Sequence, residues 1–399
     1  MSDENNVVSF GSRRRPDPAL VREFAATARR LQQERSTSTE LVERMLRTTP
    51  HQDWAALADK PSMRNAGVLE KLANEISARL ETSPQEALAL SNLATTIAET
   101  LPFDSYPPVV LAQMRAQAWR DRAQALRYLA KYRETLEALD RAESHLAAFG
   151  TLMHDRAMVM YVRGNTLRDI GALDEALSLL IESRLIFEEH GDTRRYLYCG
   201  VMEASVYYRS GDFVAGRQRY SALLEVARDL NDRETEARLH NNIGQCSTRL
   251  GEYENAVVHL ARAHALFTSL GLTAEALRTE RAEAKILVSK GDYRRGTAAL
   301  REARTKFLSH GLIEEAGLCG LEVVELLLER DDASQAVELS REIVEEFAAA
   351  ELSHRAVAAL QHLHAALEAR RASRATVRSI AEYIESLHQN PDEEFVATA

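Results

Sequence analysis

The sequence has little cysteine, with only three in 399 residues, at positions 199, 246 and 319. None belongs to a Cys-x-x-Cys pair, so the pattern excludes a disulfide framework and is typical of a reducing compartment. The chain also lacks an apolar run of eighteen residues, the length that a membrane-spanning helix needs, and no signal-peptide-like apolar segment follows Met1. These absences predict a cytoplasmic protein without a membrane anchor.

Positive charge is in the minority. The 50 Lys and Arg residues face 60 Asp and Glu residues, which gives a formal net charge of -10. The summed field repels phosphate, which argues against nucleic acid or an anionic membrane as a partner. A basic recognition helix is missing as well, because the stretch from Thr39 to Arg47 has two arginines beside two glutamates.

The sequence lacks motifs for phosphate binding and metal binding. The sequence has no Gly-x-Gly-x-x-Gly and no Gly-x4-Gly-Lys-Ser/Thr phosphate loop. Its closest histidine pairs are five residues apart (His259 and His264) and two apart (His362 and His364), and neither spacing places two imidazoles side by side on a helix. We therefore expect no metal site, no cofactor and no enzymatic activity.

Cys246 has one histidine on its predicted helix, His240, six residues away rather than the three or four that would bring the side chains together. Carboxylates are abundant, for example Glu322, Glu325 and Glu329, and such a row is typical of a solvated helix face. Neither pattern predicts a catalytic site.

What the sequence does contain is a repeat of forty residues. Inner turns recur at Gly171, Gly211, Gly251, Gly291 and Asp331, and outer turns at Gly191, Asn231, Gly271 and Gly311. Few proline residues, nine in all, and 45% hydrophobic content suit packed helices. A two-helix unit that recurs in register predicts an all-α right-handed superhelix, or solenoid.

The stretch around Leu250-Gly251-Glu252-Tyr253 shows how each unit is built. Gly251 suits a left-handed helix C-cap, and Glu252 is expected to cap the next helix by accepting its free amide protons. Gly244 on the first helix and Ala256 and Ala263 on the second are small residues where the helices must touch. The unit is a helical hairpin.

This pattern resembles the tetratricopeptide repeat (TPR) family. The family positions are occupied by Trp119, Ala142, Gly164, Ala176, Tyr207, Tyr220 and Ile243-Gly244, and Tyr132, Phe213, Tyr253 and Tyr293 follow the turns. The resemblance covers about residues 64–387, with a period of forty rather than thirty-four and a Gly-containing turn in place of the repeat-ending Pro. Such repeats are similar to those of kinesin light chains, polarity scaffolds and Rap-type regulators.

The expected domain organisation follows from this pattern. We expect a disordered leader at 1–16 and an N-terminal helical region at 17–50, with helices at 18–34 and 39–46, the second capped by Ser38 or Thr39. A divergent first hairpin at 51–101 has helices near 64–80 and 84–99, the latter after a Ser83 cap. A Pro-rich joint at 102–108, regular repeats at 109–350, a capping repeat at 351–389 and a flexible acidic tail at 390–399 complete the chain.

The resemblance also implies a binding surface, since the first helix of each hairpin lines the concave groove in this family. Transferred to this sequence, the groove carries a set of cations, tyrosines and amides: Arg120, Arg127, Tyr161, Asn165, Arg168, Tyr198, Tyr208, Arg209, Arg238, Asn241, Asn242, Gln245, Arg249, Arg278, Arg281 and Lys285. The same positions turn acidic at Glu322, Glu325 and Glu329. A cationic groove in an acidic protein suits an acidic peptide or protein segment.

Three functions remain open. The first is a non-catalytic scaffold or adaptor that binds an acidic segment in the groove. The second is a peptide- or ligand-responsive, Rap-like or transcription-associated regulator whose N-terminal helices are the output. The third is a subunit of a larger protease or defence complex. The family's carboxylate clamp is incomplete, because Tyr161 and Met202 stand at two of its positions, so chaperone-tail binding is not expected.

Overall fold

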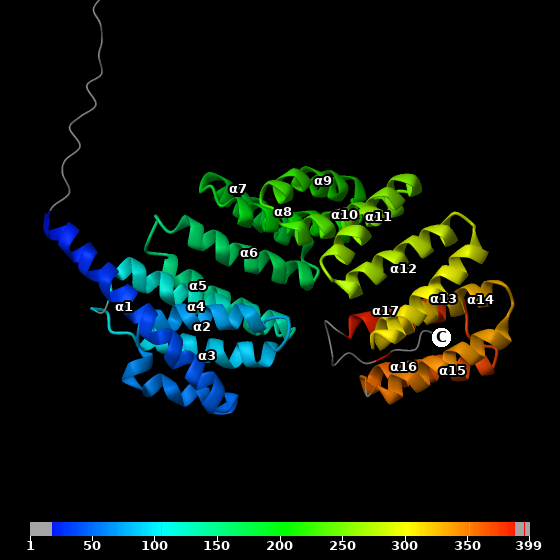
Figure 1. The fold of residues 1–399 in the computed structure, drawn as a ribbon, viewed down its shortest axis with the longest axis horizontal. Coiled ribbons are helices and arrows are strands. Elements are labelled where there is room, and N and C mark those ends of the chain that lie inside the picture. Colours follow the sequence, from blue (N-terminus) through cyan, green and yellow to red (C-terminus); the bar gives the residue numbers. More distant parts are fainter. Residues whose placement is uncertain (1–17, 105, 351, 388–394, 396–399) are drawn as a thin grey trace, which may run out of the picture. The chain divides into compact units, whose positions relative to one another are not determined.

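The computed structural model describes residues 18–104, 106–350, 352–387 and 395, except for the side chains of 18–25, 27 and 28. All regular structure in this part of the chain is helical (Figure 1). The chain divides into two compact units, Met1–Asp155 and Arg156–Ala399, which are described separately below. The expected leader at 1–16 and, apart from Phe395, the expected tail at 390–399 lie outside the described residues.

The first unit contains α1 (Pro18–Thr48), two 3₁₀ segments, η1 (His51–Asp59) and η2 (Pro61–Met63), and then α2 (Ala66–Arg79), α3 (Pro84–Thr100), α4 (Pro108–Tyr128) and α5 (Tyr132–Leu146). The expected hairpin helices near 64–80 and 84–99 correspond to α2 and α3. Ser83 occupies the N-cap of α3, but its side chain makes no capping hydrogen bond; Pro84 at the first helical position marks the start instead.

Helix α1 differs from the expectation of two helices with a break near Ser38. The hydroxyl groups in this region donate back to carbonyls of the same helix, for example Thr37 to Gln33 at 3.1 Å and Thr39 to Arg35 at 3.3 Å. Ser38 is buried and donates to the side chain of Asn65 rather than capping a helix. Hydroxyl residues that bond within the preceding turn are compatible with a continuous helix, and α1 therefore runs through to Thr48.

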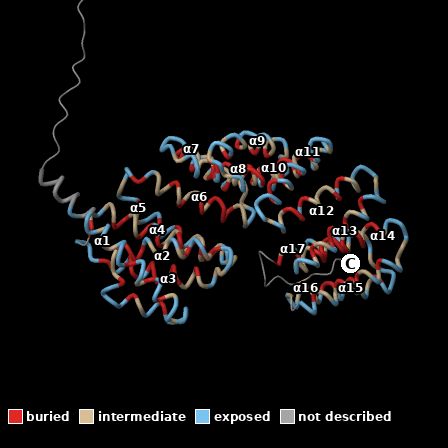
Figure 2. The backbone as a smooth tube through the Cα atoms, in the orientation of Figure 1, coloured by how far each residue is buried: buried red, intermediate tan, exposed pale blue. Residues whose placement is uncertain are grey.

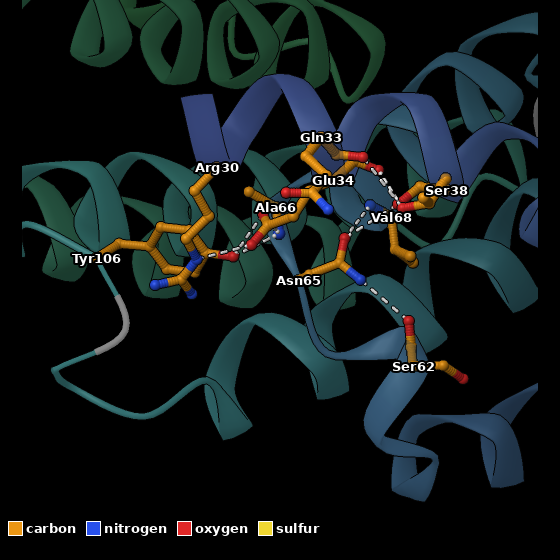
Figure 3. A network of polar contacts seen from close by, with 10 residues as sticks. Arg30, Gln33, Glu34, Ser38, Ser62, Asn65, Ala66, Val68 and Tyr106 are labelled. Carbon is orange, nitrogen blue, oxygen red and sulfur yellow. Dashed lines mark hydrogen bonds and ion pairs between the residues drawn. The ribbon is translucent and has the colours of Figure 1, made fainter. Parts of the chain in front are cut away.

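A polar network fixes α1 to the start of α2 (Figure 3). The buried Tyr106 hydroxyl donates to Glu34 Oε2 at 2.7 Å and accepts from the backbone N–H of Ala66 at 2.9 Å. Arg30 completes it, since its Nε donates to Glu34 Oε1 at 2.9 Å and its guanidinium lies 4.5 Å from the Tyr106 ring centre. The loop between α3 and α4, expected as a Pro-rich joint, thus supplies the residue that anchors α1.

The second unit is a series of helical hairpins: α6 (Met153–Asp169, whose first three residues precede the unit boundary), α7 (Leu173–Glu189), α8 (Thr193–Arg209), α9 (Phe213–Asp229), α10 (Arg233–Arg249), α11 (Tyr253–Ser269), α12 (Thr273–Ser289), α13 (Tyr293–Ser309), α14 (Ile313–Glu329), α15 (Ala333–Ala349), α16 (His354–Glu368) and α17 (Arg374–Ser386). From α6 to α15 each helix has seventeen residues, and consecutive helices from α7 to α16 pack against each other (Figures 1 and 2). The forty-residue period is confirmed.

The turns also follow the predicted pattern. Gly251 has a φ of 76°, in the left-handed region, and Asn231 and Asp331 adopt a similar conformation with φ of 52° and 56°. Glu252 occupies the N-cap of α11, but its carboxylate makes no capping bond and instead pairs with Arg217. The expected Glu252 cap is therefore wrong, because a cation on the preceding hairpin takes the carboxylate.

Each hairpin from α6 to α13 has one glycine and one alanine where its two helices touch. A methyl group on Gly244 of α10 would lie 2.8 Å from Leu260 Cγ and 3.3 Å from the carbonyl oxygen of Ala256 on α11. In the preceding hairpin the order is reversed, since Gly216 on α9 lies against the carbonyl of Ala204 on α8. The close contact predicted at Gly244 is confirmed, and only one of the two helices needs the glycine.

Candidate partner-binding face

The first helices of successive hairpins in the second unit lie next to each other. Tyr198 on α8 donates to Asp232 at the N-cap of α10, at 3.0 Å, and Arg249 on α10 donates to the Tyr208 hydroxyl on α8, at 3.4 Å. Contacts of the same kind join α6 to α8 and α12 to α14. We call the side of α6, α8, α10, α12 and α14 that carries the predicted site residues the first-helix face.

The cations of α12 are neutralised by α14. Arg281 donates to both carboxylate oxygens of Glu322, at 3.1 and 2.8 Å, and Lys285 reaches the same group at 2.8 Å. Arg278 pairs with Glu315. Burial raises the pKa of Glu322, but the two cations outweigh it and hold that pKa below its usual range. The charge expected from these three residues is therefore internally compensated.

Other predicted cations also have acidic partners. Arg168 pairs with Asp169 at 2.7 Å and donates to Ser205, and Arg238 pairs with Glu234 at 2.8 Å. In the first unit, Arg120 pairs with Asp121 at 3.0 Å. Mapping by family position selects the arginines but not the acids beside them, which are the next residue for Arg120 and Arg168 and the residue one helical turn earlier for Arg238. For these residues the expected excess of positive charge is wrong. Arg127, also in the first unit, stacks on Tyr128 at 4.8 Å.

Arg209 and Arg249 are different. Both are exposed, and neither has a carboxylate within ion-pair distance in the described part of the chain. The Arg209 guanidinium donates to the backbone carbonyl of Arg168 at 2.8 Å, and that of Arg249 lies 5.9 Å from the Phe213 ring centre. As the last residues of α8 and α10 they complement the helix dipoles, and they remain positive on the surface.

Amide groups lie next to these arginines on α10. Asn241, Asn242 and Gln245 are partly exposed, and Asn241 donates to Asn242 at a long 3.4 Å. Gln245 makes no hydrogen bond to any described residue, so its donor and acceptor are open to a partner. Tyr198, 37% exposed, adds an aromatic ring on α8, and Tyr161 is partly exposed on α6.

Asn165 is not on this surface. It is 4% exposed, and its Oδ1 has no hydrogen-bond partner among the described residues. The position that the family pattern assigns to a peptide-contacting amide is thus filled by a core residue here. A partner cannot touch Asn165 without a change in the packing of α6.

His240 and His259 form a pair that the sequence did not predict. His240 Nδ1 on α10 lies 2.9 Å from His259 Nδ1 on α11, within hydrogen-bond distance, so one imidazole donates to the other. Burial and the neighbouring His259 lower the pKa of His240 to about 4, although Glu236 at 3.9 Å opposes the shift. Spacing along one helix does not predict this pair, because it forms across the hairpin between α10 and α11.

The thiols are unreactive groups of the core. Cys246 is fully buried, and burial raises its pKa to about 11; the thiols of Cys199 and Cys319 are buried too, with pKa values raised to about 12. Among the described residues, no cluster of three or more His, Cys, Asp or Glu side chains could hold a metal ion. No described helix is both long and apolar enough to cross a bilayer.

Comparison with known proteins supports the repeat assignment. A family model described as tetratricopeptide repeat matches residues 202–269, from α8 to α11. No curated protein sequence matches the chain.

Solved structures resemble the whole repeat array. A Rap protein complexed with competence and sporulation factor is 16% identical, with a TM-score of 0.50 over 88% of this chain and 99% of that one. Aspartyl phosphate phosphatase F from Bacillus subtilis is 11% identical, with a TM-score of 0.53 over 88% and 96%. The third is a signal transduction ATPase with a tetratricopeptide repeat sensor from Pyrococcus horikoshii, 13% identical with a TM-score of 0.58; the alignment covers 90% of this chain but 53% of that protein. At these identities the likeness concerns the fold.

The forty-residue period, the left-handed turns, the small residues inside each hairpin and the matching family model agree with one another. Residues 202–269 match the tetratricopeptide repeat family, and the described helices form a tetratricopeptide-repeat-like solenoid.

Proposed function

We propose that this protein is a non-catalytic adaptor whose first-helix face binds an extended acidic segment of a partner across α8 and α10. The observation that carries the proposal is the combination of two exposed arginines without acidic partners in the described chain, Arg209 and Arg249, with the partly exposed amides of α10, of which Gln245 makes no hydrogen bond to a described residue. Arginine forks bind carboxylates, and side-chain amides bind the backbone of an extended peptide. The α12 cations contribute less, because Glu322 and Glu315 already occupy them.

The test is selection from a random peptide library on the immobilised protein. We expect Asp- and Glu-rich peptides to be enriched, and we expect the double variant Arg209→Glu with Arg249→Glu to lose that enrichment. The matched control is Arg341→Glu with Arg371→Glu, which makes the same charge change at two exposed arginines elsewhere. Selection of peptides without acidic residues, or unchanged selection by the Arg209/Arg249 variant, would reject the assignment.

A second candidate is a peptide-responsive regulator whose N-terminal helices act on another protein. The observation that favours it is the extent of the likeness to the Rap structure, which was solved with a bound competence and sporulation factor and is matched over 99% of its length. Deleting residues 1–50 would not test this idea cleanly, because Val42 and Met45 of α1 belong to the core.

Charge reversal at the exposed Arg44 of α1 is the better test of the regulator. A regulator should keep its peptide selection but lose a co-purifying partner protein, whereas an adaptor should keep both. Quantitative mass spectrometry of the co-purified proteins measures the difference.

A further inference from the structure

The last helix leaves the hairpin pattern. As the second helix of its hairpin, α17 should pack chiefly on α16, yet it packs against α14 more extensively than against α16. Its apolar side is formed by Val377, Ile380 and Ile384, which are at most 2% exposed and belong to the same core cluster as Leu321 of α14. This contact places α17 against a first helix, where a bound partner would otherwise lie.

The charges on α17 match those of α14. Arg374 donates to Glu325 at 3.0 Å and lies 3.2 Å from Glu329, and Arg378 also contacts Glu325. As a result the Glu325 side chain is only 17% exposed. Glu325 and Glu329, which the sequence places on a solvated face, are therefore paired, because α17 brings two cations to them.

The far end of α17 carries the opposite charge. Glu385 lies 3.9 Å from Arg281 of α12, the residue that already pairs with Glu322. The helix thus offers cations to the acidic α14 and an acid to the basic α12. Without α17, the face of α14 would combine Leu321 and Leu328 with the unpaired carboxylates of Glu325 and Glu329, a surface that suits a basic amphipathic helix.

We propose that α17 is a built-in occupant of the first-helix face, which hides Glu325 and Glu329 and so prevents basic segments from binding there. The helix thereby shifts the charge preference of the face, since the exposed amides and arginines of α8 and α10 stay open to partners while the paired carboxylates of α14 do not. This proposal rests on the proposed function for one point, which is that partners bind to the open surface of α8 and α10. The shielding of α14 follows from the contacts of α17 alone.

The test reverses the two cations. In the full-length variant Arg374→Glu with Arg378→Glu, repulsion from Glu325 and Glu329 should release α17. We expect backbone amide exchange across residues 374–386 to accelerate by roughly tenfold or more, and the random peptide library to yield Lys- and Arg-rich peptides that the unmodified protein does not select. The control is again Arg341→Glu with Arg371→Glu, which should change neither readout.

A compensating variant distinguishes the release of α17 from a general folding defect. Adding Glu325→Arg and Glu329→Arg to the reversed pair should restore slow exchange and remove the selection of basic peptides. If the reversed variant exchanges slowly, or exchanges fast without gaining basic peptides, the shielding role is wrong. Absence of acidic peptides with the unmodified protein would instead count against the proposed function, so the two failures are distinguishable.

Discussion

At the scale of single residues, the glycines inside the hairpins tolerate little change. Gly244 faces Leu260 Cγ, which is close to the backbone and cannot move aside as the end of a long side chain could. We expect Gly244→Ala to lower stability by about 1–3 kcal/mol through overpacking, even though alanine favours helix. Thermal unfolding measures the effect. Gly150→Ala is the control, since a methyl group there meets nothing within 4 Å, and an equal loss in both variants would contradict the packing argument.

The His240–His259 pair predicts a pH dependence. The pKa of His240 is lowered to about 4 in the folded protein, while the unfolded chain has the ordinary value near 6.5, so the unfolded state binds more protons between these limits. The stability from neutral His240 is thus present above pH 6.5 and is lost as the pH falls toward 4, by roughly 2–3 kcal/mol in all.

Melting temperatures at pH 7.5 and 5.0 test this dependence, with His240→Gln beside the unmodified protein. The variant should lose less stability on acidification, because its side chain does not titrate. Equal losses in the two proteins would show that His240 is not the group responsible.

Some of the residues that form these contacts could be predicted from the sequence, and others could not. Gly244, Ala256 and Ala263 were identified because a contact inside one hairpin repeats with the period. His240–His259 and Arg281–Glu322 were missed because each joins two helices, and the partner is fixed by helix rotation rather than by spacing along the chain. Asn165 was assigned to the surface on family position alone, whereas the local packing of α6 buries it.

At the scale of helices, α1 depends on a small number of polar contacts. Tyr106→Phe removes the hydroxyl that bonds both Glu34 and the Ala66 N–H, which keep only their direct contact of 3.2 Å, and leaves a partly buried carboxylate oxygen with one partner fewer. We expect a loss of about 1–3 kcal/mol in the first unit. Both tryptophans, Trp54 and Trp119, lie in this unit, so denaturant unfolding followed by tryptophan fluorescence reports on it.

Tyr128→Phe is the matched control for Tyr106→Phe, because the Tyr128 hydroxyl lies 3.4 Å from Glu81 and the residue is 38% exposed. It should have little effect. Similar losses in the two variants would mean that the aromatic hydroxyl at Tyr106 does not anchor α1.

The two helices that the sequence described poorly are the first and the last. Hydroxyl residues at 36–39 resemble a helix start, yet they bond within α1, and that outcome depends on Asn65 and Glu70 of the next helix, which hold Ser38 and Arg35. For α17 the amphipathic pattern was visible, but the pattern does not state which neighbour receives the apolar side. Helix existence follows from periodicity, and helix placement follows from contacts distant in sequence.

At the scale of the molecule, the net charge of -10 and the arginines of the first-helix face act over different distances. The screening length is about 8 Å at physiological salt, so a short acidic segment in contact with Arg209 and Arg249 is attracted locally while the distant acids are screened. A long polyanion such as nucleic acid would also come close to the other acidic residues of the protein and be repelled by them. This difference favours a peptide over nucleic acid as the partner and keeps the overall charge compatible with the proposal.

The pairing of one glycine with one alanine in each hairpin from α6 to α13 has a consequence for how such arrays can change. A whole hairpin can be copied or exchanged with its inner contact intact, because both members of the pair travel together. A hairpin made of α10 and α9, by contrast, would place Gly244 opposite Gly216 and leave a gap between the helices. A hairpin made of α8 and α11 would place Ala204 opposite Ala256, and their methyl groups would clash. The evolutionary module of this chain is therefore the hairpin and not the single helix.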